Sequence, residues 1–299
     1  MASTVHEIKP VKLTDLKGKA DPDWCPGCGD FGVLAALNKA LVDLQVQPYN
    51  VVTISGIGCS SNLPGYIGTY GMHTLHGRAL AVATGVKLAN HDLTVVVTGG
   101  DGDGFGIGGN HFIHTMRRKV DLVYYAMDNQ IYGLTTGQMS PTSQLGMKTK
   151  STPYGSVENP INPISLALAA GATFVARGFS GEQKHLTELI KQAIQHKGFA
   201  FIDVFSPCVT YNLDNTYPWF KQRVKKLEDD SSYDSTNWTA AMGKSQIWGE
   251  EIPIGKFFQR TDLPALHQAE PILDEGGPLA LRNLGIPPQV AKDFIAELM

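Results

Sequence analysis

The sequence lacks several features that would assign it to a common class of protein. No apolar run reaches the roughly 18 residues of a membrane-spanning helix, and residues 1–20 lack the apolar core of a signal peptide. Lysine and arginine total 25 against 28 aspartates and glutamates, so no basic excess favours nucleic acid or an anionic membrane. Cysteines number only four. We expect a cytoplasmic protein that binds neither nucleic acid nor membrane, in which paired cysteines are more often metal-binding or catalytic than disulfide-bonded.

Glycine is abundant by contrast, with 32 residues that cluster after short apolar segments. The predicted strands are 50–56, 93–100, 121–128, 173–178 and 199–206, and the predicted helices are 31–45, 78–90, 108–118, 163–171 and 182–197. This alternation predicts an α/β fold with a doubly wound parallel sheet, whose ligands bind at the carboxyl ends of the strands. We expect an N-terminal arm, 1–20, a ligand-binding domain, 21–218, and a C-terminal extension, 219–299, that packs on the core or on a partner subunit.

The glycine-rich stretch TGGDGDGFGIGGNH, residues 98–111, indicates a ligand. A turn without a ligand would be a costly use of glycine, which loses more backbone entropy on folding than any other residue. Gly104, Gly106 and Gly109 satisfy the dinucleotide-binding pattern, and Asp128 ends the next predicted strand. An NAD-binding dehydrogenase is therefore an alternative at this point.

Two aspartates in the same loop favour a divalent cation. Asp101 and Asp103 would repel a pyrophosphate by about 4 kcal/mol at 4 Å and an effective dielectric of about 20, and a bound cation reverses the sign. A calcium loop is excluded because Phe105 and Phe112 occupy positions that must ligate. The loop therefore predicts Mg²⁺, with Asp101 nearer the strand end. A second oxygen ligand is expected from Asn129, after the next strand.

The four cysteines allow several kinds of site. Cys25 and Cys28 stand in WCPGC, as in thioredoxin, but no strand leads into Trp24, and zinc would more typically show a second close pair. Cys59 and Cys208 each follow a predicted strand, so they should lie at the same sheet edge as the glycine loop. Four thiolates there suit an iron–sulfur cluster with four cysteine ligands. A thiol–disulfide protein, or burial of Cys59 and Cys208 as core residues, is the alternative.

The strongest signal is the order of six motifs. They are WCPGCG, GIGCSSN, HTLHGRA, GGDGDGFGIGGNH, NQIYGLTTGQ and SPCVTYN. In this order they closely resemble the β subunit of the 2-oxoacid:ferredoxin oxidoreductases, above all those acting on 2-oxoglutarate. The resemblance covers about residues 20 to 215 and is weaker in WGEEIPIGKFF.

The resemblance implies three cofactors and their residues. It implies thiamine diphosphate with Mg²⁺ held by Asp101, Asn129 and the carbonyl of Ile131. It implies one 4Fe–4S cluster on the four cysteines. The residues implied to bind thiamine diphosphate are Ile57, Gly58, Cys59, Ser60, His76, Gly77, Arg78, Gly102, Asp103, Gly133 and Leu134.

The resemblance also implies that the chain is half of an active site. The catalytic glutamate is expected on an α subunit with the pyrimidine-binding domain, so no catalytic base is assigned here. The implied reaction is the coenzyme A-dependent oxidative decarboxylation of 2-oxoglutarate or a related 2-oxoacid, with electrons passing through the cluster to ferredoxin. Arg78, Leu134 and Thr136 are implied to line the substrate pocket. Broad-specificity relatives often carry lysine at the position of Thr136, so the distal carboxylate should depend on Arg78 or on the partner.

Other functions are kept as alternatives. The nearest is a pyruvate or broad-specificity enzyme of the same family. An NAD-binding dehydrogenase and a cluster-bearing subunit without thiamine diphosphate are further from the motifs. The retained cofactors would distinguish them.

Overall fold

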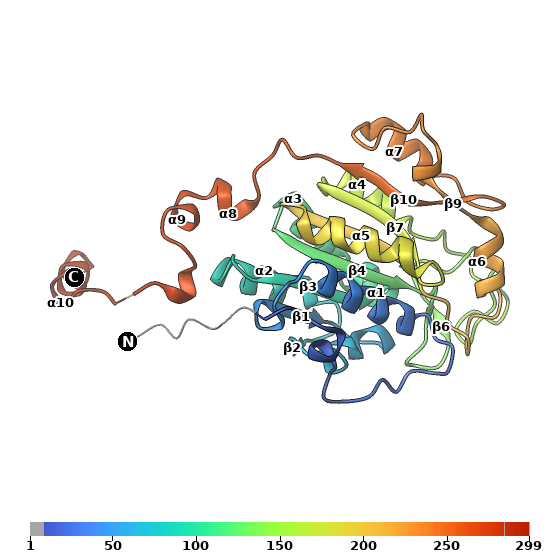
Figure 1. Cartoon of the computed structure of the whole chain (residues 1–299), viewed down its shortest axis with the longest axis horizontal. Helices are drawn as coiled ribbons and strands as arrows, with labels where there is room; N and C mark the ends of the chain where they lie inside the picture. Colours follow the sequence, from blue (N-terminus) through green and yellow to red (C-terminus); the bar gives the residue numbers. More distant parts are fainter. Residues whose placement is uncertain (1–8, 284, 299) are drawn as a thin grey trace.

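A computed structural model describes residues 9–283 and 285–298; residues 1–8 of the predicted arm lie outside the described residues. The centre of the structure is an eight-stranded sheet (Figure 1). Its strands are β1 Val51–Ser55, β2 Tyr70–His73, β3 Thr94–Gly100, β4 Leu122–Asp128, β7 Phe174–Phe179, β8 Phe199–Phe205, β9 Val224–Lys226 and β10 Ile252–Gln259. The spatial order is β2-β1-β3-β4-β8-β7-β10-β9, and neighbours are parallel except β7 and β10.

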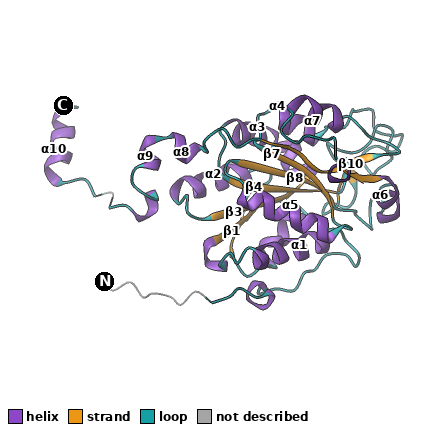
Figure 2. Cartoon of the chain, turned by 45° about the horizontal axis from the view of Figure 1, so that its top comes forward, coloured by secondary structure: helices purple, strands orange, loops and turns teal. Residues whose placement is uncertain are grey.

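Helices cover both faces of this sheet. They are α1 Asp30–Asp43, α2 Ala79–Ala89, α3 Gly109–Arg117, α4 Pro163–Ala169, α5 Gln183–Gln195, α6 Tyr217–Arg223, α7 Trp238–Ser245, α8 Leu266–Ala269, α9 Pro271–Asp274 and α10 Pro288–Glu297. Figures 1 and 2 show α1 and α5 side by side on one face. Buried residues of α2, α3, α4 and α7 form the core on the other face.

The strands read as continuous apolar runs because they are buried on both sides. Every residue of β4 and β8 is buried, as expected for parallel strands covered by helices on each face. Along β4, Tyr124 packs into one core and Tyr125 into the other, which is the two-residue alternation of a strand. This packing fixes the strand register and hence the position of every loop at the carboxyl ends.

The doubly wound parallel sheet predicted from the sequence is confirmed, and the five predicted strands are β1, β3, β4, β7 and β8. Two larger strands were not predicted. β2 pairs with β1 but is exposed along its length, so it lacks an apolar pattern. β10, which lies within the C-terminal extension, is buried and pairs antiparallel with β7.

The two ends of the chain differ in how they meet the sheet. The described part of the arm packs on the core, because Leu16 is fully buried and Lys17 bridges to Ile67. From α8 onward the chain reaches away from the sheet, and α10 stands apart from it in Figures 1 and 2. Among the described residues, no helix combines the length and apolar character needed to span a membrane.

Candidate active site

A cavity of about 100 Å³ lies where the carboxyl ends of β1, β3 and β4 meet. It is lined by Ile57, Gly58, Cys59, Ser60, His76, Gly100, Asp101, Gly102, Asp103, Ile131, Tyr132, Gly133, Leu134 and Thr135. Loops distant in sequence thus contribute to one wall. Four of the predicted site residues are within two positions of a lining residue in the sequence but do not line the cavity. They are Gly77, Arg78, Asn129 and Thr136.

Asp101 follows β3 directly and is buried at the base of the cavity. Its Oδ2 accepts hydrogen bonds from Ser140 Oγ and Thr142 Oγ1, both at 2.5 Å. Burial raises the pKa of Asp101 to about 6, although these hydroxyls oppose the shift. The side chain is therefore a buried carboxyl held by neutral donors.

A second buried carboxyl, Asp128, shares Thr142 with Asp101. Thr142 Oγ1 lies 2.8 Å from Asp128 Oδ1, yet a hydroxyl carries a single hydrogen to donate. Burial raises the pKa of Asp128 well above its usual range, and the nearby Asp101 adds to the shift. We infer that protonated Asp128 donates to Thr142, which in turn donates to the carboxylate of Asp101.

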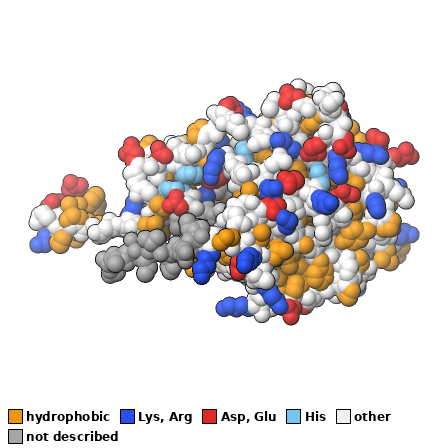
Figure 3. Space-filling view, viewed as in Figure 1, with side chains coloured by type: hydrophobic (Ala, Val, Ile, Leu, Met, Phe, Trp, Pro, Cys, Tyr) orange, Lys and Arg blue, Asp and Glu red, His pale blue; other side chains and the backbone are white. Residues whose placement is uncertain are grey.

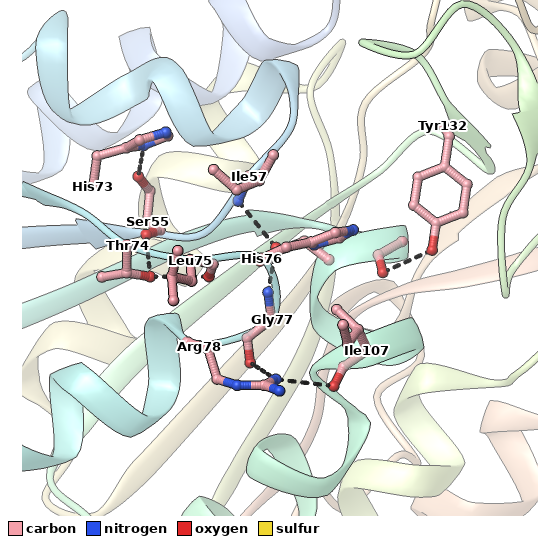
Figure 4. Close-up of polar contacts among 12 residues, drawn as sticks. Ser55, Ile57, His73, Thr74, Leu75, His76, Gly77, Arg78, Ile107 and Tyr132 are labelled. Carbon is pink, nitrogen blue, oxygen red and sulfur yellow. Dashed lines mark hydrogen bonds and ion pairs between the residues drawn. The ribbon is translucent and has the colours of Figure 1, made fainter.

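Asp103 connects three segments through one oxygen. Its Oδ1 accepts hydrogen bonds from the Ile57 backbone at 3.0 Å, the Gly77 backbone at 2.7 Å and His76 Nδ1 at 2.6 Å (Figure 4). A Cβ at Gly56 would lie 2.0 Å from Asp103 Oδ2, so only glycine fits there. Asp103 therefore fastens the loop after β1 and the turn before α2 to the glycine loop, and acts as a positioning residue.

His76 and Arg78 make separate sets of contacts (Figure 4). The Asp103 contact occupies Nδ1 of His76, whose ring meets Tyr132 edge-on at 6.3 Å and lines the cavity. Arg78 instead donates from NH1 to the carbonyls of Gly77 and Ile107, each at 3.4 Å. The role expected for Arg78 stays a prediction.

The loop after β4 is held in a strained conformation. Gln130 and Thr136 have φ of 60° and 73°, which residues with a side chain rarely adopt and which cluster at functional sites. Asn129 Oδ1 accepts a hydrogen bond from the Ile131 backbone at 3.0 Å, and its carbonyl accepts from Asn212 Nδ2 at 2.9 Å. These contacts explain how the loop keeps its shape beside the cavity.

A cation missed by the sequence analysis stands at the same loop. Lys150 Nζ donates to Thr136 Oγ1 at 2.6 Å, and the Lys150 backbone N–H donates to the Gly137 carbonyl at 3.1 Å. Leu134, two residues before Thr136, is 53% exposed and lies at the rim of the cavity. The sequence offered no signal for Lys150, because its position depends on how residues 139–152 fold back.

The four cysteines are free thiols beside the cavity. A Cβ at Gly133 would lie 3.6 Å from Cys59 Sγ and 3.8 Å from Cys208 Sγ. The turn that carries the other two is closed by the Cys28 N–H, which donates to the Cys25 carbonyl at 2.9 Å. The next residue, Gly29, donates its N–H to the Pro207 carbonyl at 3.1 Å, so this turn is fixed beside Cys208.

The environment of Cys28 and Cys59 favours the protonated thiol at these two residues. Burial raises the pKa of Cys59 to about 11, and the buried Asp30, Cys208 and Cys25 add to the shift. The same causes raise the pKa of Cys28, with burial again the largest. Within the described ranges, no three His, Cys, Asp or Glu side chains are already arranged to hold a metal ion.

The chemistry of the donors nevertheless fits two different inorganic groups. Asp101 and the backbone around Asn129 and Ile131 offer oxygen ligands, which Mg²⁺ prefers. The cysteines offer only sulfur, the ligand of iron–sulfur clusters. Cys59 lines the cavity itself, so the sulfur group and the oxygen group adjoin one another.

Comparisons with known proteins agree with this geometry. Residues 56–204 match the thiamine pyrophosphate enzyme C-terminal TPP-binding domain, and residues 208–275 match the C-terminal family of the pyruvate ferredoxin oxidoreductase β subunit. A Sulfolobus 2-oxoacid:ferredoxin oxidoreductase β subunit is 50% identical, covering 82% of this chain and 84% of its own. The Methanocaldococcus jannaschii 2-oxoglutarate synthase subunit KorB is also 50% identical, over 78% of this chain and 86% of its own.

A solved structure extends the similarity to nearly the whole chain. It is the 2-oxoglutarate:ferredoxin oxidoreductase from Magnetococcus marinus, with 2-oxoglutarate, coenzyme A and succinyl-CoA bound. The similarity has a TM-score of 0.88 at 43% identity and covers 98% of this chain and 97% of that one.

Proposed function

The chain belongs to the β subunits of the 2-oxoacid:ferredoxin oxidoreductases, and from this premise we propose that it contributes the diphosphate and cluster half of an enzyme that converts 2-oxoglutarate, coenzyme A and oxidised ferredoxin into succinyl-CoA, CO₂ and reduced ferredoxin. The observation that best supports this proposal is that one cavity is lined both by the oxygen donor Asp101 and by Cys59. A site that only bound a nucleotide would have no need of the cysteines.

The oxygen donors would hold Mg²⁺ and a diphosphate. Asp101, Asn129 and the Ile131 carbonyl would hold the ion. A cation would also stabilise Asp101, a buried carboxylate that its hydroxyl partners only partly compensate. The loop of Ile57–Ser60 and the segment of Gly102 and Asp103 line the cavity around that point.

His76 would act on the diphosphate through its second nitrogen. Because Nδ1 donates to the Asp103 carboxylate, Nε2 can offer a hydrogen to a phosphate oxygen only when the ring is an imidazolium. Asp103 thereby positions His76 and the backbone segments of Ile57 and Gly77 beside the proposed diphosphate site.

Thiamine diphosphate, when bound, would supply the nucleophilic carbon and the electron sink for decarboxylation. This chain would supply the cluster, held by Cys25, Cys28, Cys59 and Cys208, that removes the electrons. Gly133 and Leu134 would form the wall between the reacting carbon and the sulfurs, because Gly133 lies against Cys59 and Cys208. The proton-transferring glutamate is expected on the α subunit, so either chain alone would be inactive.

The distal carboxylate of 2-oxoglutarate needs a cation, since a buried unpaired charge costs several kcal/mol. Lys150 at Thr136 is the candidate that this chain offers beside the rim. The M. jannaschii and M. marinus relatives are named for 2-oxoglutarate, which favours this substrate over pyruvate. Preference for pyruvate would change the substrate while leaving the reaction class intact.

We further propose a cytoplasmic enzyme, since free thiols and an iron–sulfur cluster suit a reducing compartment. The division into an arm, a domain of 21–218 and a C-terminal extension is kept as part of this proposal. The pairing of β10 with β7 supports an extension that packs on the core.

The test is anaerobic co-purification of this chain with its α subunit. Iron, sulfide, magnesium and thiamine diphosphate are measured per αβ pair, and coenzyme A-dependent reduction of ferredoxin is assayed with 2-oxoglutarate, pyruvate and 2-oxobutyrate. We expect a brown protein with thiamine diphosphate and the fastest reduction with 2-oxoglutarate. Full activity of this chain alone would contradict the half-site, and retained nicotinamide nucleotide would favour a dehydrogenase.

A further inference from the structure

A groove of about 690 Å³ runs along the other side of the cysteines from the candidate active site. It is lined by Gly27, Cys28, Phe31, Gly32, Ser180, Gly181, Glu182, Gln183, Lys184 and Tyr217. Cys59 lines the candidate active-site cavity and Cys28 lines this groove, so the sulfurs stand between the two. An electron removed at the cavity would therefore leave the cluster toward the groove.

The rim of the groove is basic. Lys184 lines it and is exposed, and α6 begins with Tyr217 in the groove wall. Lys221 is four residues further along α6 and so lies on the same helix face. The segment KQRVKK, 221–226, then adds further cations without an acidic residue. We call Lys184, Lys221 and Lys226 the basic rim.

The acidic residue in the groove wall is already neutralised. Glu182 Oε2 pairs with Lys226 Nζ at 3.1 Å, so it does not offset the rest of the basic rim. Arg223, at the end of α6, lies over the ring of Trp219 at 4.4 Å. Figure 3 shows Lys and Arg side chains (blue) over the region of α6 and the adjoining end of α5.

Two partly exposed apolar side chains, Phe31 and Val209, stand in and beside the groove. Phe31 is 38% exposed and packs edge-on against Trp24 beside the cysteine turn. Val209 is 39% exposed, and its Cγ1 lies 3.7 Å from the position of a Cβ at Gly27. Exposed apolar side chains beside charged ones are common in specific protein interfaces, and the rim charge selects the sign of the partner.

We propose that this groove is where an acidic ferredoxin docks to take electrons from the cluster. The inference rests on the proposed function, which supplies the reduced cluster. Each docking event would transfer one electron from a cluster held by the four cysteines to the cluster of the ferredoxin, and no bond or proton would change place. The basic rim steers the negative protein, and Phe31 and Val209 bring it into contact beside Cys28.

The experiment uses the αβ complex with two electron acceptors. Lys184→Glu and Lys221→Glu are made singly and together, and 2-oxoacid-dependent reduction is measured with an acidic bacterial ferredoxin and with methyl viologen. In the double variant we expect the KM for ferredoxin to rise at least about tenfold and its salt dependence to flatten, because long-range attraction is lost. Viologen reduction should stay within twofold, because the cavity and cysteines are untouched.

The matched control is Lys12→Glu, which changes an exposed lysine on the N-terminal arm. Its neighbour Val11 hydrogen-bonds Gln45, beyond the end of α1 opposite the groove. This variant should leave the ferredoxin KM unchanged. An unchanged KM in the Lys184→Glu/Lys221→Glu variant would overturn the proposal. Loss of the α subunit on purification would do the same, by showing that the partner covers the groove. No viologen reduction by the unmodified complex with any 2-oxoacid would instead defeat the proposed function.

Discussion

The two ends of the parallel strands both bury carboxylates, but only one end pairs them with lysine. At the amino end, Asp121 lies 3.1 Å from the buried Lys87 and 3.8 Å from Lys197, and it accepts the Gly198 N–H. At the carboxyl end, within the described residues, Asp101 and Asp128 are held by hydroxyl groups instead. Asp121 therefore has cationic partners, whereas the side-chain partners of Asp101 are hydroxyl groups.

This difference identifies the functional end better than cavity size does. A cavity of about 300 Å³ at the amino end, lined by Lys87 and Asp121, is larger than the one of about 100 Å³ at Asp101. Yet a buried ion pair needs no further ligand, whereas a buried carboxylate with only neutral donors is stabilised by a cation. Incomplete charge compensation therefore indicates where a cofactor binds.

The largest expected effect is the loss of the cluster. Cys208→Ser removes one of the four proposed thiolate ligands at the carboxyl end of the strands, and serine is a poor substitute ligand for iron. Anaerobic iron and sulfide analysis should show little or no cluster, and ferredoxin reduction should disappear. Thiamine diphosphate binding should persist, because Cys208 does not line the cavity. A normal iron content would remove Cys208 from the ligand set.

The next effect is on the oxygen donors. Asp101→Ala should weaken Mg²⁺-dependent binding of thiamine diphosphate by more than about 100-fold, above the cost of losing a residue that only orients a ligand. Titration calorimetry of the αβ complex measures this. Asp103→Asn should lose less, since an amide oxygen still accepts from Ile57 and Gly77. The reverse order would mean that Asp103 holds the ion.

At the amino end of the strands, we expect substitution to change the stability alone. Lys87→Met leaves Asp121 buried without its closest cation, which typically costs about 3–5 kcal/mol, or a fall of roughly 10 °C in Tm. Thiamine diphosphate affinity of the folded complex should not change. Adding Asp121→Asn should recover part of the loss, because the unpaired charge is then removed. A loss of thiamine diphosphate affinity in Lys87→Met would contradict the assignment of cofactor binding to the carboxyl end alone.

A buried histidine at the same end makes stability depend on pH. His196 contacts Thr173 Oγ1 at 2.8 Å, and burial lowers its pKa from 6.5 to about 4. The unfolded chain therefore binds more protons between these values, so stability is full above about pH 6.5 and falls as the pH drops toward 4. His196→Gln should remove on the order of 2 kcal/mol of this acid-induced loss, measured as a flatter plot of Tm against pH. An unchanged slope would assign the acid sensitivity to other groups.

The sequence predicted the strands and loop residues that depend on local sequence pattern. Continuous apolar runs located β3 and β4, and glycines and aspartates directly after a strand located Asp101 at the carboxyl edge. Strand order then brings such segments together in any doubly wound sheet, which is why motifs distant in sequence could be assigned to one site.

Features that depend on tertiary folding were not accessible. β2 has no apolar pattern because it is exposed, and the ion pair of Lys87 with Asp121 joins α2 to the start of β4. The three hydrogen bonds to Asp103 also require three loops to be in place, so the sequence could not identify its partners. Lys150 was missed for the same reason.

The smallest expected effect tests whether the carboxyl end supplies its own cation for the substrate. Lys150→Met removes the ammonium at Thr136, and the matched control Lys148→Met removes an exposed lysine two residues away. Because Lys150 is exposed, its contribution should be about 1 kcal/mol, or roughly fivefold in kcat/KM for 2-oxoglutarate. Activity with 2-oxobutyrate, which lacks the distal carboxylate, should stay constant in both variants. An equal loss with both substrates would show that Lys150 supports the loop of Thr136 and Gly137, and the α subunit would then have to supply the cation.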